Sequence, residues 1–350
     1  MSELLRGAGR GMKRVIILTA FLASAVSALA QDMPPPAVKP AVPGILDAFK
    51  THDLIGLGDY HGLAQEQDFY AALVRDSRFA DEVGNLVLEF GAISQPIIDR
   101  YVSGEDVSYT ELRKVWTESV GWVPTGTYIG FLNLFAQVRV VNAGLPPQKR
   151  IRIWLSDPNI DWRTVKTKAD WLPLVRQRDI YAHDLIRREI LSKGKKALVI
   201  WGGTHFFRAG EIGPLLQESH PGSLLIVSPY TGFNEASCSV AFEKETALPT
   251  PSLATVRGTS LKIALSRPGC HPAPTGTPPE QEGHWSGADA DALLYLGPAA
   301  TLTFSQKSPD IYMDDAFRAE MSRRYQIIMG KPLSSATVKD NSVSPRLLRP

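Results

Sequence analysis

Two histidines follow apolar segments at the same distance from a glycine. The motif GDYH (residues 58–61) comes after one apolar run, and GGTH (202–205) comes after another. Glycine has no Cβ, so it lets a strand turn sharply and bring an imidazole back over a sheet. An imidazole titrates near neutral pH and can take a proton from water as a general base. The spacing therefore predicts that His61 and His205 belong to one acid–base site.

Carboxylates accompany these histidines. Glu89 lies near the end of the apolar run LVLEF (86–90), and Asp59 lies two residues before His61. A carboxylate at the end of a buried strand is costly unless it is paired or used in chemistry. We expect Glu89 or Asp59 to orient His61 or to share its proton. Asp157, in the stretch SDPN, is interpreted as part of an ordinary Asp-Pro turn.

A basic residue lies on a later helical segment, RDIYAHD (178–184). Arg178 is expected either to pair with Glu89 or to bind an anionic group of a substrate. A solvated charge on the helix surface is the competing interpretation. Asp179 and His183 are i, i+4 neighbours, and this spacing indicates a structural pair.

The same side chains have the ligand types that a divalent metal prefers. His61, Glu89 and His205 would be its ligands. The sequence leaves open whether water is activated by such a metal or directly by an imidazole. It contains neither a G-x-S-x-G nor an S-x-x-K motif, so a serine nucleophile is not indicated. A glycine-rich phosphate loop is also missing from the sequence.

Short apolar runs alternate with amphipathic segments along the chain. This alternation predicts an α/β fold with three layers, a mostly parallel central sheet and helices on both faces. The carboxyl ends of parallel strands lie at one edge of a sheet, so the motif residues would converge there. The predicted strands are 54–58, 86–90, 151–156, 197–202, 224–228 and 292–297, and the predicted helices are 64–76, 128–143, 171–194, 208–218 and 310–330.

The first residues resemble an export signal. Residues 1–30 contain a basic region, a short apolar segment and a small-residue ending, Ala28-Leu29-Ala30. This layout is typical of a signal peptide that is cleaved near Ala30. We therefore expect a periplasmic or secreted protein.

The rest of the chain is expected to form one domain with irregular flanks. A proline-rich linker (31–45) precedes a single α/β domain (46–330), and a flexible tail (331–350) follows it. Within the domain, residues 245–285 are rich in Pro, Thr and Gly and are predicted to form an irregular insertion.

Charge excludes one class of partner. The chain has 38 Lys and Arg against 36 Asp and Glu, and the leader holds four of the former and one of the latter. The mature chain is therefore almost neutral, and we expect a small-molecule substrate or ligand and no nucleic acid. No segment after the leader is long and apolar enough to span a membrane. Cys238 and Cys270 would meet an oxidising compartment, where a disulfide and two free thiols remain alternatives.

The order of the motifs resembles that of a known superfamily. GDYH, then VLEFG (87–91), then RDIYAHD, then GGTH is similar to the arrangement that joins erythromycin esterase-like hydrolases, ChaN-like haem-uptake proteins and Tiki/TraB proteins. The resemblance covers about residues 50–230. It implies that His61 and His205 are the two family histidines and that Glu89 is the strand-end glutamate. Arg178 and Asp179 match the Arg-Asp pair of the esterase branch.

This resemblance implies two functions. The first is an exported hydrolase that activates water with His61, Glu89 and His205 against an ester or amide, with Asp59 and Arg178 in support. Asp59 stands where the esterase and ChaN branches have the longer glutamate, and the Tiki branch implies a bound metal. The alternative is a ChaN-like protein that binds haem or another ligand without turnover, with Tyr60 as a haem ligand.

Overall fold

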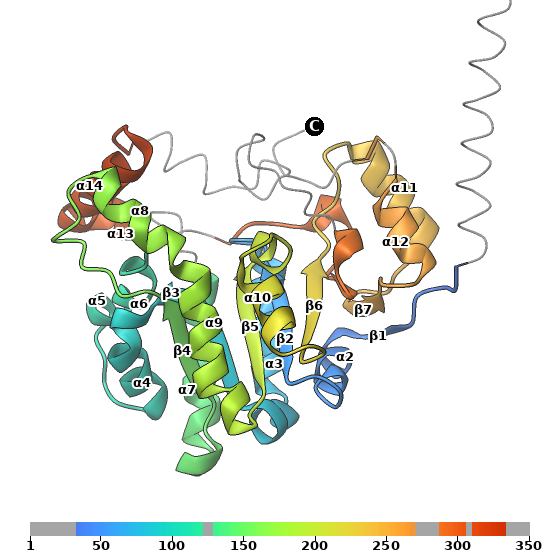
Figure 1. Ribbon diagram of the computed structural model, residues 1–350, viewed down its shortest axis with the longest axis horizontal. Coiled ribbons are helices and arrows are strands. Elements are labelled where there is room, and N and C mark those ends of the chain that lie inside the picture. The colour runs from blue at the N-terminus through green and yellow to red at the C-terminus, as the bar shows by residue number, and fades with distance from the viewer. Residues whose placement is uncertain (1–32, 122–128, 268, 271–286, 306–309, 334–350) are drawn as a thin grey trace, which may run out of the picture.

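The computed structural model describes residues 33–121, 129–267, 269–270, 287–305 and 310–333. It shows an eight-stranded, mostly parallel sheet between two layers of helices, which confirms the predicted α/β class (Figure 1). The predicted leader (1–30) lies outside the described residues, as does most of the predicted tail.

Six strands form the parallel part of the sheet and coincide with the six predicted apolar runs. They lie in the order β8-β6-β2-β5-β3-β4, and each strand is parallel to its neighbours. Both faces of these strands are covered, which explains their continuously apolar sequences. Their bounds are β2 (Leu54–Asp59), β3 (Asn85–Gly91), β4 (Arg152–Asp157), β5 (Ala197–Gly202), β6 (Leu224–Pro229) and β8 (Ala292–Tyr295).

The predicted linker is wrong in its second half. Residues Val38–Pro40 form the edge strand β1, and helix α2 (Ala41–Ala48) follows at once. The prolines that suggested a linker fit both elements. Pro40 lies on an edge strand, where proline is tolerated, and Pro43 lies in the first helical turn, where no helical hydrogen bond needs its nitrogen.

The predicted irregular insertion (245–285) also contains regular structure. Strand β7 (Ser252–Thr255) pairs antiparallel with β8 on one side and with β1 on the other. Helix α11 (Ala236–Thr246) ends inside this stretch, and α12 (Ser260–Leu265) follows β7. These elements are too short to produce a clear period in sequence, and β7 depends on its pairing with β8. Residues 271–286 of the stretch lie outside the described residues.

Side chains of the central strands alternate between two cores. Leu198 and Ile200 of β5 belong to the first core, whereas Val199 and Trp201 belong to the second. This period of two is the geometry of a strand with both faces buried. The first core is covered by α2, α3 (Ala64–Arg75), α4 (Gln95–Ser103) and α7 (Ile129–Ala143), and the second by α9 (Arg178–Glu189) and α10 (Ile212–Ser219) (Figure 1).

The long predicted helix 171–194 is two helices. It breaks at Gln177, between α8 (Lys168–Arg176) and α9. The N–H of Gln177 donates to the carbonyl of Leu174 at 3.1 Å, which tightens the last turn of α8. The break makes Arg178 the first residue of α9.

The closing helix is also divided. Predicted as 310–330, it consists of α13 (Asp310–Met313) and α14 (Asp315–Met329), and the Asp314 carboxylate caps α14 by accepting from the N–H of Phe317 at 2.9 Å. Arg324 of α14 donates to the carbonyl of Thr117 at 2.7 Å. Helix α14 thus contacts the segment that contains α5 (Tyr109–Leu112) and α6 (Lys114–Thr117).

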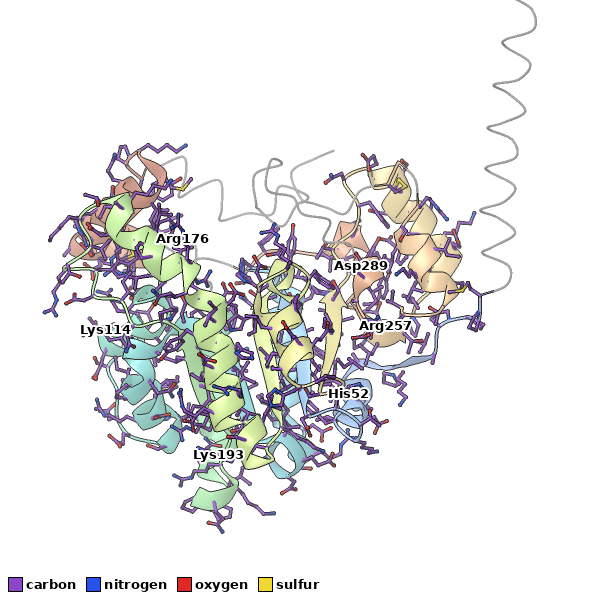
Figure 2. All side chains as sticks on the ribbon, in the orientation of Figure 1. His52, Lys114, Arg176, Lys193, Arg257 and Asp289 are labelled. Atoms are coloured by element: carbon purple, nitrogen blue, oxygen red, sulfur yellow. A yellow bond between two sulfur atoms is a disulfide. The ribbon has the colours of Figure 1, made fainter. Side chains whose placement is uncertain are left out.

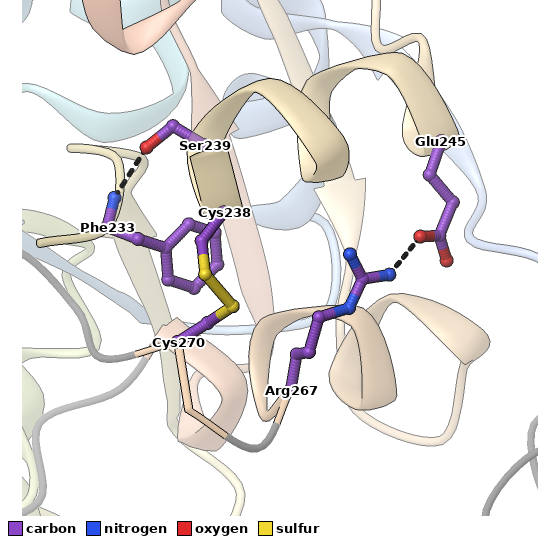
Figure 3. Close-up of a disulfide and its surroundings, with 6 residues drawn as sticks. All are labelled: Phe233, Cys238, Ser239, Glu245, Arg267 and Cys270. Carbon is purple, nitrogen blue, oxygen red and sulfur yellow. Dashed lines mark hydrogen bonds and ion pairs between the residues drawn. A yellow bond between two sulfur atoms is a disulfide. The ribbon is translucent and has the colours of Figure 1, made fainter. Parts of the chain in front are cut away.

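Cys238 and Cys270 form a disulfide (Figure 3). Cys238 lies on α11 and Cys270 lies beyond α12, with their Cα atoms 5.7 Å apart. Both pack against a separate apolar cluster that includes Phe242 and Tyr295. The disulfide therefore joins the two helices over the antiparallel end of the sheet.

Charged side chains lie around the outside of this core. Lys114, Lys193 and Arg257 are exposed and lie at the periphery of the molecule (Figure 2). Among the described residues, none of the helices combines the length and the apolar character needed to cross a membrane.

Candidate active site

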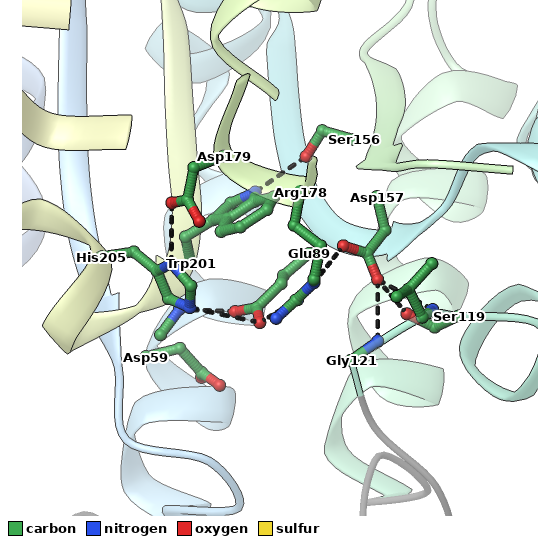
Figure 4. A network of polar contacts seen from close by, with 12 residues as sticks. Asp59, Glu89, Ser119, Gly121, Ser156, Asp157, Arg178, Asp179, Trp201 and His205 are labelled. Atoms are coloured by element: carbon green, nitrogen blue, oxygen red, sulfur yellow. Dashed lines mark hydrogen bonds and ion pairs between the residues drawn. The ribbon is translucent and has the colours of Figure 1, made fainter. Parts of the chain in front are cut away.

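The carboxyl ends of four neighbouring strands bring together the predicted site residues. Asp59 ends β2, Glu89 lies near the end of β3, Asp157 ends β4, and His205 follows β5 in the short 3₁₀ turn Gly203–Phe206. The three carboxylates are all buried. The prediction that these strand ends converge is therefore confirmed (Figure 4).

Asp59 holds the first histidine. Nδ1 of His61 donates to Oδ2 of Asp59 at 2.6 Å, so the shorter carboxylate does reach the ring. Burial alone would lower the pKa of His61. The hydrogen bond to Asp59 and the negative charges of Asp59 and Glu89 outweigh burial and raise this pKa above 6.5.

Asp179 holds the second histidine in the same way. Nδ1 of His205 donates to Oδ1 of Asp179 at 2.7 Å, and the N–H of Ile212 donates to the same oxygen at 3.0 Å. Burial opposes the charged ring here too, but Asp179 and Glu89 raise the pKa of His205. The sequence placed Asp179 with His183 in a structural pair. His183 instead contacts Ser219 and Asp184.

Glu89 is a fixed negative charge between these groups. Its Oε1 accepts from Arg178 at 2.5 Å, and its Oε2 accepts from the N–H of Gly202 at 2.6 Å. Burial would raise the pKa of Glu89, but Arg178, His205 and His61 lower it to about 2. The buried ion pair with Arg178 therefore keeps Glu89 ionised.

A local irregularity of β3 directs Glu89 toward its partners. The register between β3 and β4 shifts between Leu88 and Gly91, the feature of a β-bulge. At Gly91, a Cβ would lie 1.8 Å from the carbonyl oxygen of Glu118, so only glycine fits there. The bulge and the glycine explain why a carboxylate lies inside an otherwise apolar strand.

Arg178 pairs with Glu89, as one of the expectations stated, and is not a solvated surface charge. Its Nε also donates to Oδ1 of Asp157 at 2.6 Å (Figure 4). Interpreting Asp157 as an ordinary turn residue was wrong. Its other oxygen, Oδ2, accepts from the hydroxyl of Ser119 at 2.6 Å and from the N–H of Gly121 at 3.1 Å. Arg178 and Asp157 thus join β3, β4 and α9 to the loop after α6.

A glycine leaves room beside the first histidine. A Cβ on Gly202 would lie 3.2 Å from Nε2 of His61 and 3.3 Å from Oε2 of Glu89. Nε2 of His205 lies 4.0 Å from Oε1 of Glu89. His205 therefore directs Nε2 toward Glu89, and Nε2 of His61 lies beside Gly202, whose N–H donates to the same carboxylate. The Nδ1 atoms of both rings are held by aspartates.

The predicted metal ligands do not form a metal site together. The ligand atoms of His61, Glu89 and His205 do not all come within 4.8 Å of one another. Such a group does exist among the described residues, formed by Asp179, His205 and Glu211. Oε2 of Glu211 is buried, accepts no hydrogen bond among the described residues and lies 3.7 Å from Nδ1 of His205.

Tyr60 is part of a small apolar cluster. Its ring packs on that of Phe304, with the two centroids 5.7 Å apart, and the cluster also contains Leu63 and Leu302. The segment around Phe304 pairs with the turn after β2, since the N–H of Ala64 donates to the carbonyl of Thr303 at 2.9 Å.

Sequence reasoning missed two further buried polar residues, Glu66 and Tyr70 of α3. Both are fully buried, and the Tyr70 hydroxyl donates to Oδ1 of Asp59 at 2.8 Å. The available signal was their spacing of four residues directly after GDYH, which places both on one helix face.

Solved structures that are similar to this chain share little sequence with it. No protein-family model matches it, and no curated protein does. A protein from Bacillus cereus is similar in structure, with 13% identity, coverage of 78% of this chain and 97% of the other, and a TM-score of 0.47. A succinoglycan biosynthesis protein has 10% identity, coverage of 60% and 76%, and a TM-score of 0.44. The type III effector HopBA1 has 16% identity, coverage of 57% and 88%, and a TM-score of 0.35.

Proposed function

We propose that this protein is an exported hydrolase that cleaves an ester or amide bond of a small molecule. One observation carries the proposal. Two imidazoles are each oriented by an aspartate at Nδ1, and both lie beside one ionised glutamate at the carboxyl edge of the sheet, which raises the pKa of each ring. This arrangement provides a general base and a general acid in one site. The resemblance of the motif order to the esterase superfamily supports an ester or amide as the substrate class.

His61 is the base in this proposal. Neutral Nε2 takes a proton from water while the water oxygen bonds to the carbonyl carbon of the substrate. The resulting imidazolium is stabilised by Asp59 at 2.6 Å and by the charge of Glu89. Because Asp59 fixes the proton on Nδ1, the basic lone pair lies on Nε2.

His205 is the acid. In its protonated form, Nε2–H donates to the oxyanion that forms when water adds to the carbonyl, or passes its proton to the leaving group as the bond breaks. Its raised pKa favours the protonated form that this role requires. Asp179 and Glu89 stabilise the positive ring, and Arg178 keeps Glu89 ionised.

A metal-dependent form of this hydrolysis is a second candidate, favoured by the group Asp179, His205 and Glu211. Two carboxylates and an imidazole suit a divalent ion, and Oε2 of Glu211, which accepts no hydrogen bond among the described residues, would gain a ligand bond. Such an ion would polarise a carbonyl or activate water. Metal analysis of purified wild type and of Glu211→Gln separates the two forms, since only the metal-dependent form predicts an ion lost in the variant.

Export is proposed on two grounds. The leader has the layout of a signal peptide, and the Cys238–Cys270 disulfide suits an oxidising compartment.

The test is a broad screen of ester and amide substrates. Wild type is compared with His61→Ala and His205→Ala, and His220→Ala serves as a control because His220 hydrogen-bonds Ser219 and contacts no site residue above. We expect turnover in wild type and the control, and a loss of about 100-fold or more in the two site variants. Turnover that survives both substitutions would contradict the proposal. A Soret band on haem titration that is lost in Tyr60→Phe, without hydrolysis, would favour the ligand-binding alternative.

A further inference from the structure

Helix α3 carries two buried polar side chains behind the first histidine turn. Glu66 and Tyr70 are both fully buried, and the proposed hydrolysis uses neither of them. They lie four residues apart and therefore on one face of the helix. Burying a polar group costs free energy unless the group has a hydrogen-bond partner. The contacts of Glu66 and Tyr70 therefore indicate their roles.

Tyr70 contacts the carboxylate that holds His61. Its hydroxyl donates to Oδ1 of Asp59 at 2.8 Å, and Oδ2 of the same carboxylate accepts from Nδ1 of His61 at 2.6 Å. Each oxygen of Asp59 thus has its own donor, on opposite sides. Rotation of the carboxylate would break both bonds, so Tyr70 fixes the plane in which Asp59 meets the imidazole.

Glu66 contacts the backbone between Asp59 and His61. Its Oε2 accepts from the N–H of Tyr60 at 2.9 Å. Burial, followed by the negative charge of Asp59, raises the pKa of Glu66 well above its usual range. This shift favours the protonated form of Glu66, whose contact with the backbone N–H of Tyr60 holds the turn in either form.

We propose that Tyr70 and Glu66 are positioning residues that hold Asp59 and the turn at Tyr60 so that this carboxylate meets Nδ1 of His61. The proposal rests on the proposed function for its effect on turnover, but its geometric content is independent of any reaction. Tyr70 acts on His61 through Asp59, and Glu66 acts on it through the backbone of Tyr60. We call this chain of contacts the relay.

The direction of the effect follows from the contacts. Without the phenolic donor, the buried charge of Asp59 has the imidazolium as its main remaining partner, so protonated His61 becomes more favourable. Tyr70→Phe should therefore raise the pKa of His61. The kcat at neutral pH should fall about tenfold with KM unchanged, because less of the base is neutral and a hydrogen bond to a charged group is lost.

The experiment is an NMR titration of the His61 ring in the intact protein, which needs no substrate. Tyr230→Phe is the matched control, since Tyr230 is also buried and donates to a carboxylate, Glu243, at 2.9 Å, but lies in the disulfide-linked cluster. We expect a raised His61 pKa in Tyr70→Phe and no change in the control. An unchanged or lowered His61 pKa in Tyr70→Phe would overturn the proposal.

Two further variants test the relay when Tyr70→Phe is poorly folded. Placing 3-fluorotyrosine at position 70 keeps the shape and strengthens the donor, so the His61 pKa should fall, and a value that rises or stays constant contradicts the relay. Glu66→Gln keeps a side-chain oxygen that can accept from the N–H of Tyr60 and should change the His61 pKa less than Tyr70→Phe does. A larger change would show that Glu66 acts on His61 through its charge and not through the backbone, and would overturn its assigned role. An NMR shift without any hydrolysis would sink the proposed function and leave the relay intact.

Discussion

His61 and His205 are each held at Nδ1 by one aspartate, at 2.6 and 2.7 Å. This bond decides which ring nitrogen carries the proton and where the other nitrogen points. Glu89, with its pKa lowered to about 2, supplies a permanent charge near both rings and stabilises their protonated forms. The two aspartates therefore fix the orientation of the imidazole rings, and Glu89 makes the electrostatic potential at both rings more negative.

Asp59→Asn tests the orienting role. The amide removes the negative charge and no longer favours the proton on Nδ1, so hydrolysis should fall about 100-fold and the pKa of His61 should fall as well. The matched control is Asp161→Asn, because Asp161 pairs with an arginine on the surface. Steady-state kinetics of both variants give the comparison, and equal activities would contradict the role of Asp59.

The pH dependence of turnover follows from the raised pKa of His61. A general base works only when it is neutral, so kcat/KM should rise with pH through a value above 6.5, the ordinary value for an imidazole. Asp59 and Glu89 stabilise the charged ring, so the neutral imidazole that acts as the base forms only at a higher pH. A pH–rate profile of wild type measures this limb. A limb centred below 6.5 is incompatible with His61 as the base.

Hydrogen bonds and ion pairs between side chains of different helices and strands hold the site together. Arg178, the first residue of α9, donates to Glu89 of β3 and Asp157 of β4, and Asp157 also holds the loop that contains Ser119. The sequence could predict the strands, because their apolar runs are continuous. It could not predict the break at Gln177, which has ordinary helical residues on both sides. It therefore offered Glu89 as a partner of Arg178 but not Asp157, and it did not place Asp179 against His205.

Arg178→Met should be strongly destabilising. It leaves Glu89 and Asp157 buried without their cation, and breaking a buried ion pair by removing one partner costs about 3–5 kcal/mol. Urea unfolding measures the change, and Arg163→Met is the control because Arg163 pairs with Asp161 on the surface and should matter much less. Equal losses in the two variants would show that the buried network does not stabilise the fold.

The molecule combines a parallel sheet, whose strand ends form the site, with an antiparallel end that carries the disulfide. The convergence of His61, Glu89 and His205 could be predicted, since it follows from topology alone. Strands β1 and β7 could not, because they are short and depend on pairing, β7 with β8 and β1 with β7. Tyr70 and Glu66 were missed because tertiary packing, and not their pattern, brings them to Asp59 and Tyr60.

The disulfide should contribute stability without affecting the site. Cys238 and Cys270 are separated by 32 residues and pack in an apolar cluster of their own. Replacing both with serine should lower the free energy of unfolding by about 3–4 kcal/mol and leave kcat unchanged. Urea unfolding of the variant and of reduced wild type should agree. A large fall in kcat would show that this end of the sheet is coupled to the site.

The most direct test of the account is chemical rescue of His61→Ala with added imidazole. The His61 side chain is 26% exposed, so its replacement by alanine opens a space of ring size that free imidazole can reach from solvent. The account predicts that His61→Ala loses ester or amide hydrolysis and that imidazole restores part of it in its neutral form, with no effect on the wild type. Hydrolysis by His61→Ala at the wild-type rate without imidazole would contradict the account.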